Sequence, residues 1–218
     1  LVGSEMCIRD SSNLYFREPE SRADQTRMMS IVTTGAETGY YVDVFRSRKE
    51  KGGDKMHDYF YHNLGQTLTL TAADGSDLNL QSTEELAFAG AHLYAYSYLY
   101  DKKVAATNKD VKATFTIDMK DKDGDDIYMN LWMKGEPDRE VFTALAPMTE
   151  GLSRTPNMPY NIKEQPTLTF VARQHGEAWN RPFVSIYEPS TKKEPSAIQS
   201  VSYFDAEAVS YTHLRAHE

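Results

Sequence analysis

The runs Val111-Lys-Ala-Thr-Phe-Thr-Ile-Asp-Met119 and Ile127-Tyr-Met-Asn-Leu-Trp-Met133 each place apolar side chains at every second position. A period of two is typical of a β-strand that buries one face. Between the runs lies Asp121-Lys-Asp-Gly-Asp125. An Asp-Gly pair between two alternating runs is the strongest short-range signal for a hairpin. The region therefore predicts two antiparallel strands joined by a tight turn.

The same pattern recurs along the chain. We expect further strands at Arg27 to Thr34, Tyr40 to Arg48, Met56 to His62, Thr67 to Thr71, Glu140 to Leu145, Thr167 to Arg173, Pro182 to Tyr187 and Ala197 to Phe204. Gly, Pro, Asn or Asp separates most of these segments. Many short strands without regular intervening helices favour antiparallel pairing. The predicted fold is all-β, an antiparallel β-sandwich of many short strands.

One segment is open to two interpretations. Ser82-Thr-Glu-Glu85 has the form of a capping box, which would begin a short helix running through Leu86 and Leu93. Beyond it, the tyrosines between Tyr94 and Tyr100 occupy every second position. If that segment is extended, they share one face, either as a stacking platform for sugar rings or as a sheet surface that packs against another layer.

The two ends of the chain are related to each other through their codons. One set of codons for Val209 to Glu218 has a reverse complement that encodes Leu1 to Asp10 without a mismatch. An inverted pair around an insert is typical of a sequencing adapter. We therefore assign residues 1–10 and 209–218 to adapter, exclude them from the fold prediction as one excludes a tag, and expect a single β-sandwich domain fragment over residues 11–208.

The formal charge argues against two classes of partner. The chain carries −8, of which the ends supply −1, because Glu5, Arg9 and Asp10 sum to −1 while Arg215 and Glu218 cancel. Nucleic acid and anionic membrane both favour a basic surface, so neither is expected as a partner. An anionic polysaccharide fits only if basic residues are clustered locally. Between the adapter ends there is no cysteine, which excludes disulfides and a thiol nucleophile there.

The residues with the most chemistry lie around one loop. The segment Tyr40 to Arg48 is followed, across Gly52-Gly53, by His57-Asp-Tyr-Phe-Tyr-His62. If the two strands pair, six side chains come together: Asp43, Arg46, His57, Tyr59, Tyr61 and His62. These residue types suit β-elimination on a uronate chain, which needs a neutralised carboxylate, a base such as His or Tyr, and an acid such as Tyr.

Two other interpretations of the same residues stay open. His and Asp side chains could hold a divalent metal, although His57 and His62 lie on opposite sides of a regular strand and cannot share an ion without a bulge. Alternatively, these are partly buried polar residues that bond to neighbouring backbone and have no chemical role.

Several short blocks, in order, resemble the C-terminal part of the heparinase II/III-like polysaccharide lyases. These blocks are Tyr41-Val-Asp-Val-Phe-Arg46, Gly52-Gly53 with His57-Asp-Tyr59, Glu136 to Val141, Pro166 to Phe170 and Gly176 to Pro189. The resemblance implies an enzyme in which an N-terminal α/α toroid carries most catalytic groups and a β-sandwich closes one wall of the cleft. It implies that this chain holds only the sandwich, is inactive alone, and has the toroid and an acidic polysaccharide as partners.

The resemblance also implies roles for particular residues. His57 and Tyr59 are the candidate catalytic residues. Asp43 and His57 match a structural zinc site that some members of the family have. Where the family often has His-x-His-Ala-Asp, this chain has Glu20-Ser-Arg-Ala-Asp24, so the histidine part of that zinc site is missing.

Arg46, Arg48 and Arg181 are the candidate contacts for a substrate carboxylate or sulfate, because a guanidinium binds such groups in a bidentate manner. A solvated strand face is the structural alternative for each of them. By resemblance, the enzyme would be secreted or periplasmic. The competing function is a non-catalytic carbohydrate-binding or structural β-sandwich module.

Overall fold

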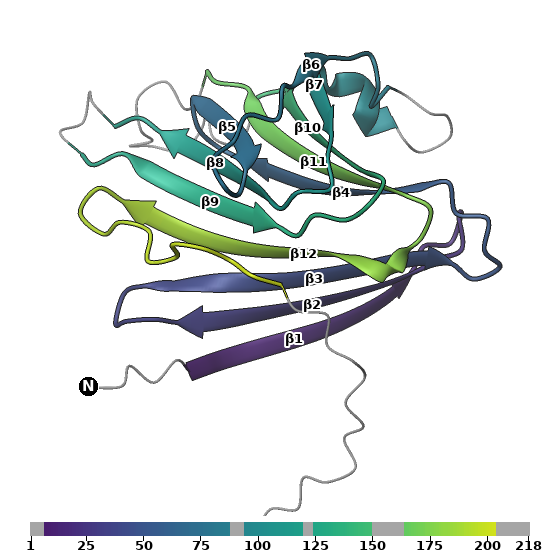
Figure 1. The fold of residues 1–218 in the computed structure, drawn as a ribbon, viewed down its shortest axis with the longest axis horizontal. Coiled ribbons are helices and arrows are strands. Elements are labelled where there is room, and N and C mark those ends of the chain that lie inside the picture. The colour runs from purple at the N-terminus through teal and green to yellow at the C-terminus, as the bar shows by residue number, and fades with distance from the viewer. Residues whose placement is uncertain (1–6, 88–93, 120–123, 150–163, 204–218) are drawn as a thin grey trace, which may run out of the picture.

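The computed structural model describes residues 7–87, 94–119, 124–149 and 164–203, with the side chains of residues 7–9 left out. Within these ranges the chain forms two antiparallel sheets and one short 3-10 helix, η1 (Tyr94–Tyr98). The predicted all-β sandwich is confirmed (Figure 1). None of the helices in the described ranges has the length and apolar character needed to cross a bilayer.

The larger sheet, sheet A, has the strand order β1-β2-β3-β12-β9-β8-β5 within the described residues. Its strands are β1 (Cys7–Arg17), β2 (Ala23–Thr33), β3 (Gly39–Lys49), β12 (Ala178–Thr191), β9 (Ile127–Met133), β8 (Val111–Ile117) and β5 (Thr67–Ala72). The predicted hairpin is its β8–β9 pair, in which Ile117 faces Ile127. Residues 120–123 of its turn lie outside the described residues.

The smaller sheet, sheet B, has the order β4-β11-β10-β7-β6 within the described residues. Its strands are β4 (Met56–Asn63), β11 (Thr167–His175), β10 (Arg139–Ala146), β7 (Tyr100–Ala106) and β6 (Gln81–Ser82). The inner faces of the two sheets share one apolar core, with Phe115, Phe170 and Phe183 almost fully buried at its centre. The apolar side chains at every second position in the sequence therefore point into the core, and the side chains between them point to the outer faces of the sheets.

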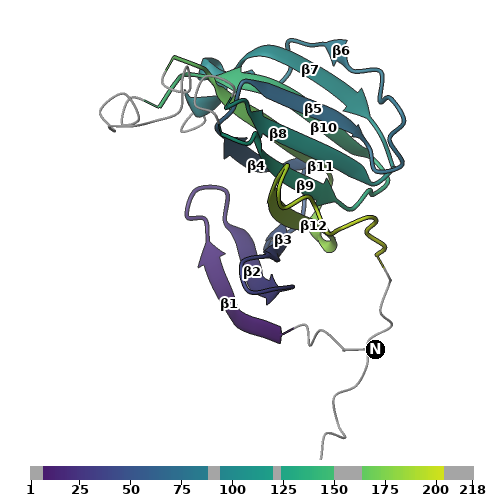
Figure 2. The ribbon, with the colours of Figure 1, turned by 90° about the vertical axis from the view of Figure 1, so that its left-hand side faces the viewer.

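Sheet A extends beyond sheet B. Figure 2 shows β1, β2 and β3 continuing past the strands of sheet B, so the inner face of β1 and β2 has no opposing layer among the described strands. Leu14, Phe16, Met29 and Ile31 on that face are 40 to 65% exposed. β1 begins at Cys7 and so includes residues that we assign to adapter. Because main-chain hydrogen bonds between strands form with almost any side chains, the presence of β1 does not test the adapter assignment. That assignment stays a prediction.

The predicted strand from Ala197 to Phe204 is wrong for its described part, because residues 197–203 form no strand. The amides of Ala197 and Ile198 donate to the carboxylate of Glu188, at 2.7 and 3.3 Å. A buried side chain thus takes the place of a neighbouring strand. Phe204 lies outside the described residues.

The capping-box helix is also absent from the described part of its range. Ser82 belongs to β6, and Leu86 has a positive φ of 54°. The hydroxyl of Thr83 accepts from the amide of Glu85 at 3.0 Å, which is a local turn. Leu86 instead packs into a second apolar cluster on the outer face of sheet B, so tertiary packing outweighs the capping signal.

A glycine makes the crossing from sheet B to sheet A possible. Gly65, between β4 and β5, has φ +144°, and a Cβ there would lie 2.5 Å from the carbonyl oxygen of Thr116. Gly75 has φ +83° but nothing within 4 Å of its Cβ position. An alanine at Gly75 would therefore meet backbone strain alone, whereas an alanine at Gly65 would also overlap with neighbouring backbone.

We expect Gly75→Ala to lower the free energy of unfolding by about 1 kcal/mol, the cost of a positive φ for alanine. Gly65→Ala adds overlap with backbone and is expected to lower it by about 3 kcal/mol. Urea denaturation of both variants provides the measurement. Equal losses would show that the crossing tolerates a side chain.

Candidate functional site

A fully buried carboxylate lies where the two sheets separate. Asp43 of β3 is 0% exposed and faces inward. Arg27 of β2 binds it with two nitrogens: Nε lies 3.0 and 3.1 Å from the two carboxylate oxygens, and Nη2 lies 2.5 Å from Oδ2. From sheet B, the Tyr59 hydroxyl donates to Oδ2 at 2.6 Å. The Asp43 cluster, formed by these three residues with Ser185 and Tyr187, therefore joins the two sheets.

Two further hydroxyls complete this cluster. Tyr187 of β12 is hydrogen-bonded to the Tyr59 hydroxyl, and Ser185 Oγ lies 3.2 Å from the same atom. Burial, followed by the electrostatic effects of Tyr187 and then Asp43, raises the pKa of Tyr59 far above its ordinary value. The hydrogen bond to Asp43 raises the pKa of Arg27. At neutral pH the tyrosine is therefore a hydrogen-bond donor and the arginine a cation.

The expected meeting of β3 and β4 takes place, but not within one sheet. The two strands belong to opposite sheets, so Asp43 and Tyr59 approach each other through the core. Strand alternation turns Arg46 and His62 to outer faces. The expected grouping of six side chains is therefore wrong for these two residues, because the loop between the strands crosses from one sheet to the other.

His57 lies on the inward side of β4 but binds a different acid from Tyr59. Its Nε2 is 2.7 Å from Oδ1 of Asp54, and the side chains are 11% and 8% exposed. Burial raises the pKa of Asp54, but hydrogen bonds from His57 and from the Lys49 amide lower it more, so the net shift is downward. His57 therefore anchors the loop between β3 and β4.

The zinc and catalytic assignments are left as predictions. Both oxygens of Asp43 are bound by Arg27, and Oδ2 also by Tyr59, while His57 turns to Asp54. Among the described residues, no group of three or more His, Cys, Asp or Glu side chains is placed to hold a metal ion. A metal at Asp43 would have to displace Arg27.

The three predicted arginine contacts have structural partners. Arg46 donates to the carbonyl oxygen of Trp179, and the guanidinium of Arg48 lies 4.1 Å from the centre of the Trp179 ring. Arg181 donates to the carbonyl oxygens of Pro137 and His175, at 3.1 and 3.0 Å. These contacts hold the bulged start of β12. The sequence did not single out Arg27, the arginine that lies beside Asp43.

A second buried ion pair lies on the outer face of sheet B. Arg173 binds Asp58 in a bidentate manner, with two contacts of 2.8 Å, and the side chains are 9% and 6% exposed. Tyr96 of η1 donates to the same carboxylate at 2.7 Å. This pair clamps the segment that leads into β7. Leu99 lies in the apolar cluster beside it.

The tyrosines from Tyr94 to Tyr100 do not form a common face. Tyr94 to Tyr98 lie in a 3-10 helix, which has three residues per turn, so alternate side chains point in different directions. Tyr96 is held against Phe60 and Asp58, while Tyr94 and Tyr98 are 62% and 63% exposed. Both alternatives, a sugar platform and a packed sheet surface, assumed an extended segment, and Tyr94 to Tyr98 are not extended.

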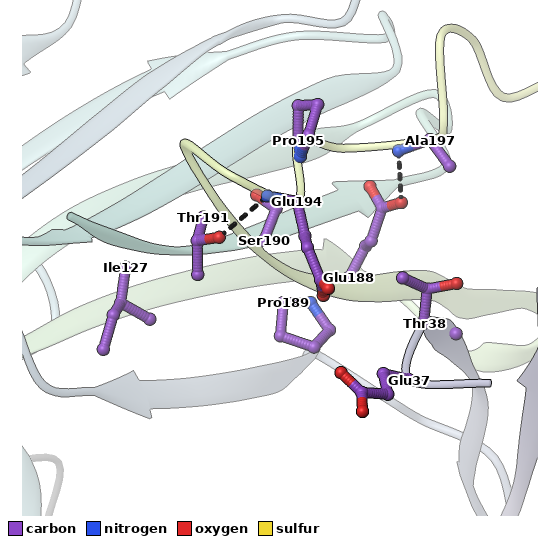
Figure 3. Close-up of a pocket in the computed structure, with 11 residues that line it drawn as sticks. Glu37, Thr38, Ile127, Glu188, Pro189, Ser190, Thr191, Glu194, Pro195 and Ala197 are labelled. Atoms are coloured by element: carbon purple, nitrogen blue, oxygen red, sulfur yellow. Dashed lines mark hydrogen bonds between the residues drawn. The ribbon is translucent and has the colours of Figure 1, made fainter. Parts of the chain in front are cut away.

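A pocket lies at the other end of β12 and is acidic. Figure 3 shows Glu37 in the turn from β2 to β3, Glu188 on β12 and Glu194 on the segment after it. Glu188 is 5% exposed and is bound by Ser196 and by the Ala197 amide. Its carboxylate organises the segment after β12. The pocket does not suit an anionic ligand.

Comparison with known proteins found a similar enzyme. The chain is 33% identical over 192 residues to an endo-acting ulvan lyase of Formosa agariphila. The match covers 86% of this chain but 22% of that protein. No protein-family model matches the chain, and no solved structure does either. The similarity supports a relationship to polysaccharide lyases, and it does not single out the heparinase II/III-like type.

The Arg173–Asp58 pair gives a stability prediction. Arg173→Met leaves a buried carboxylate without its cation and is expected to lower the free energy of unfolding by about 3 kcal/mol. Adding Asp58→Asn removes that unpaired charge, so the double variant should lose less than the sum of the single variants. Urea denaturation provides the measurement. Additive losses would show that the two residues act independently.

Asp54 gives a pH prediction. Its folded pKa is lowered from 3.8, so the unfolded chain takes up a proton at a higher pH than the folded chain does. The stability that Asp54 contributes is full above 3.8 and is lost as the pH falls through the lowered folded value. Wild type and Asp54→Asn, unfolded by urea across the acid range, should therefore converge as the pH falls. A constant difference would contradict the assignment.

Proposed function

We propose that this chain is the β-sandwich part of a secreted polysaccharide lyase that cleaves uronate-containing polysaccharide by β-elimination. The observation that carries the proposal is the 33% identity to an endo-acting ulvan lyase over most of this chain. The chain spans about a fifth of that protein's length, so the parent's activity is inferred from a part of it. The two-sheet fold is compatible with a domain that supplies one wall of a cleft.

The buried geometry limits what the sandwich does in such a reaction. The Tyr59 hydroxyl lies in the core and is bound to Asp43, Ser185 and Tyr187. The pKa of Tyr59 is raised, which opposes a role as base at neutral pH. We therefore propose that Tyr59 and His57 position the wall, and that the acid and base come from the rest of the parent.

The competing function is a non-catalytic carbohydrate-binding module. The observation that favours it is the engagement of the predicted site residues in structural contacts: His57 with Asp54, and Arg46 and Arg48 with Trp179. Such a module would bind glycans and release no product. The two functions differ in the product that a longer protein forms.

The test compares the 218-residue chain with the longer protein encoded by the uninterrupted gene, on ulvan and other uronate polysaccharides. β-Elimination leaves an unsaturated uronate, which is measured by its ultraviolet absorbance. We expect product from the longer protein and none from the chain alone. His57→Ala in the longer protein should lower the rate by disturbing the loop between β3 and β4.

Glycan binding without product from the longer protein would favour the binding module. Product from the chain alone would contradict the proposal that the acid and base lie elsewhere. Lys51→Ala serves as the control, because it changes an exposed residue of the same loop while leaving the bond between His57 and Asp54 in place.

A further inference from the structure

The inner face of β1, β2 and β3 beyond sheet B is a partly apolar surface with one fixed cation. We call it the overhang face and define it by Leu14, Phe16, Arg27, Met29, Ile31 and Tyr41. The strand register places them on one side, because Leu14 faces Arg27, Arg27 faces Phe45, and Ile31 faces Tyr41. This is also the side of Asp43, which faces Met29.

Arg27 is held rigidly at the boundary between this face and the core. Its Nε and Nη2 bind Asp43, which is fully buried. The guanidinium has five N–H donors in a fixed plane. Among the contacts of the described residues none uses its Nη1, and the Arg27 side chain is 43% exposed. The remaining donors are therefore oriented before any ligand arrives.

The surroundings of Arg27 suit a sugar ring. A depression beside it is lined by Leu14, Phe16, Gln25, Thr26 and Phe45. Phe16 and Leu14 offer apolar surface to the CH face of a pyranose, while Gln25, which faces Phe16, carries a hydrogen-bonding amide. On the overhang face, the acid nearest to Arg27 is Asp43, and Arg27 already neutralises it.

We propose that Arg27 binds a carboxylate or sulfate group of an anionic polysaccharide on the overhang face, with Leu14 and Phe16 against the sugar ring. The proposal rests on the proposed function, and it replaces Arg46, Arg48 and Arg181 as the anion contact. Asp43 is the positioning residue, because it sets the plane of the guanidinium. The pair as a whole is neutral, so binding depends on directed N–H groups more than on net charge.

The test measures binding of three polymers to the 218-residue chain by calorimetry at low salt: dextran sulfate, alginate, and neutral dextran. Dextran sulfate carries sulfate, alginate carries carboxylate, and dextran controls for the neutral backbone. We expect binding to one or both polyanions and none to dextran. Arg27→Lys keeps a cation beside Asp43 but loses the planar donors, and should weaken binding on the order of tenfold.

A second pair of variants does not depend on the buried carboxylate. Leu14 and Tyr15 are 65% and 60% exposed and lie on opposite sides of β1. Leu14→Glu places a like charge on the overhang face and should weaken polyanion binding on the order of tenfold, whereas Tyr15→Glu should leave it nearly unchanged. Arg46→Met tests the sequence-based prediction that Arg46 contacts the substrate anion, and this variant should bind the polyanions like wild type.

Other outcomes would overturn the inference. These are equal binding by Leu14→Glu and wild type, loss of binding in Arg46→Met, or binding of neutral dextran as tight as that of the polyanions. No polyanion binding, with a dimer in sedimentation that Leu14→Glu disrupts, would instead make the overhang face a contact between copies.

The two proposals fail separately. If the longer protein yields no unsaturated product but polyanion binding depends on Arg27, only the proposed lyase function is rejected. If the longer protein is an active lyase but neither Arg27→Lys nor Leu14→Glu changes polyanion binding, only the proposed Arg27 site is rejected.

Discussion

The buried carboxylate of Asp43 is the interaction on which the arrangement of the two sheets depends. A carboxylate with no exposure is costly unless it is paired and hydrogen-bonded. Arg27 supplies the charge from the same sheet, and Tyr59 supplies a hydroxyl from the opposite one. β2, β3 and β4 therefore have to meet at this point, and the apolar core continues on one side of it while sheet A continues alone on the other.

The boundary at Asp43 gives the molecule two kinds of inner surface. On the core side, Phe45, Tyr59 and Phe183 pack ring against ring between the sheets. On the other side, the same sheet face carries exposed Leu14, Phe16 and Met29. An apolar sheet face of this kind is typical of an interaction surface. Arg27, at the junction, is the cation that such a surface would present to an anionic glycan.

Outside the core, buried charged side chains hold two chain segments in place. Arg173 and Asp58 hold the segment before β7 against sheet B, and Glu188 holds the segment after β12. Each of them takes the place of secondary structure that the sequence pattern suggested there. The positions of charged residues in the sequence alone are therefore a poor guide to the binding surfaces of this protein.

The period of two, the turn residues and the Asp-Gly hairpin were sufficient to predict an all-β antiparallel sandwich, because alternation between core and solvent is a local property of each strand. The sequence also singled out Asp43, His57 and Tyr59, as candidate metal-binding or catalytic residues, and those roles stay predictions. It could not assign β3 and β4 to different sheets, because pairing between distant strands leaves little trace in local periodicity.

Tertiary structure decided the rest. It joined Asp43 to Arg27, turned His57 toward Asp54, and used Arg46 and Arg48 against Trp179. Arg27 escaped notice in the sequence because nothing in its own strand marks it. Only the register of β2 on β3 brings it within bonding distance of a carboxylate 16 residues away. The partner of a side chain is set by which strands become neighbours, and that is a property of the whole fold.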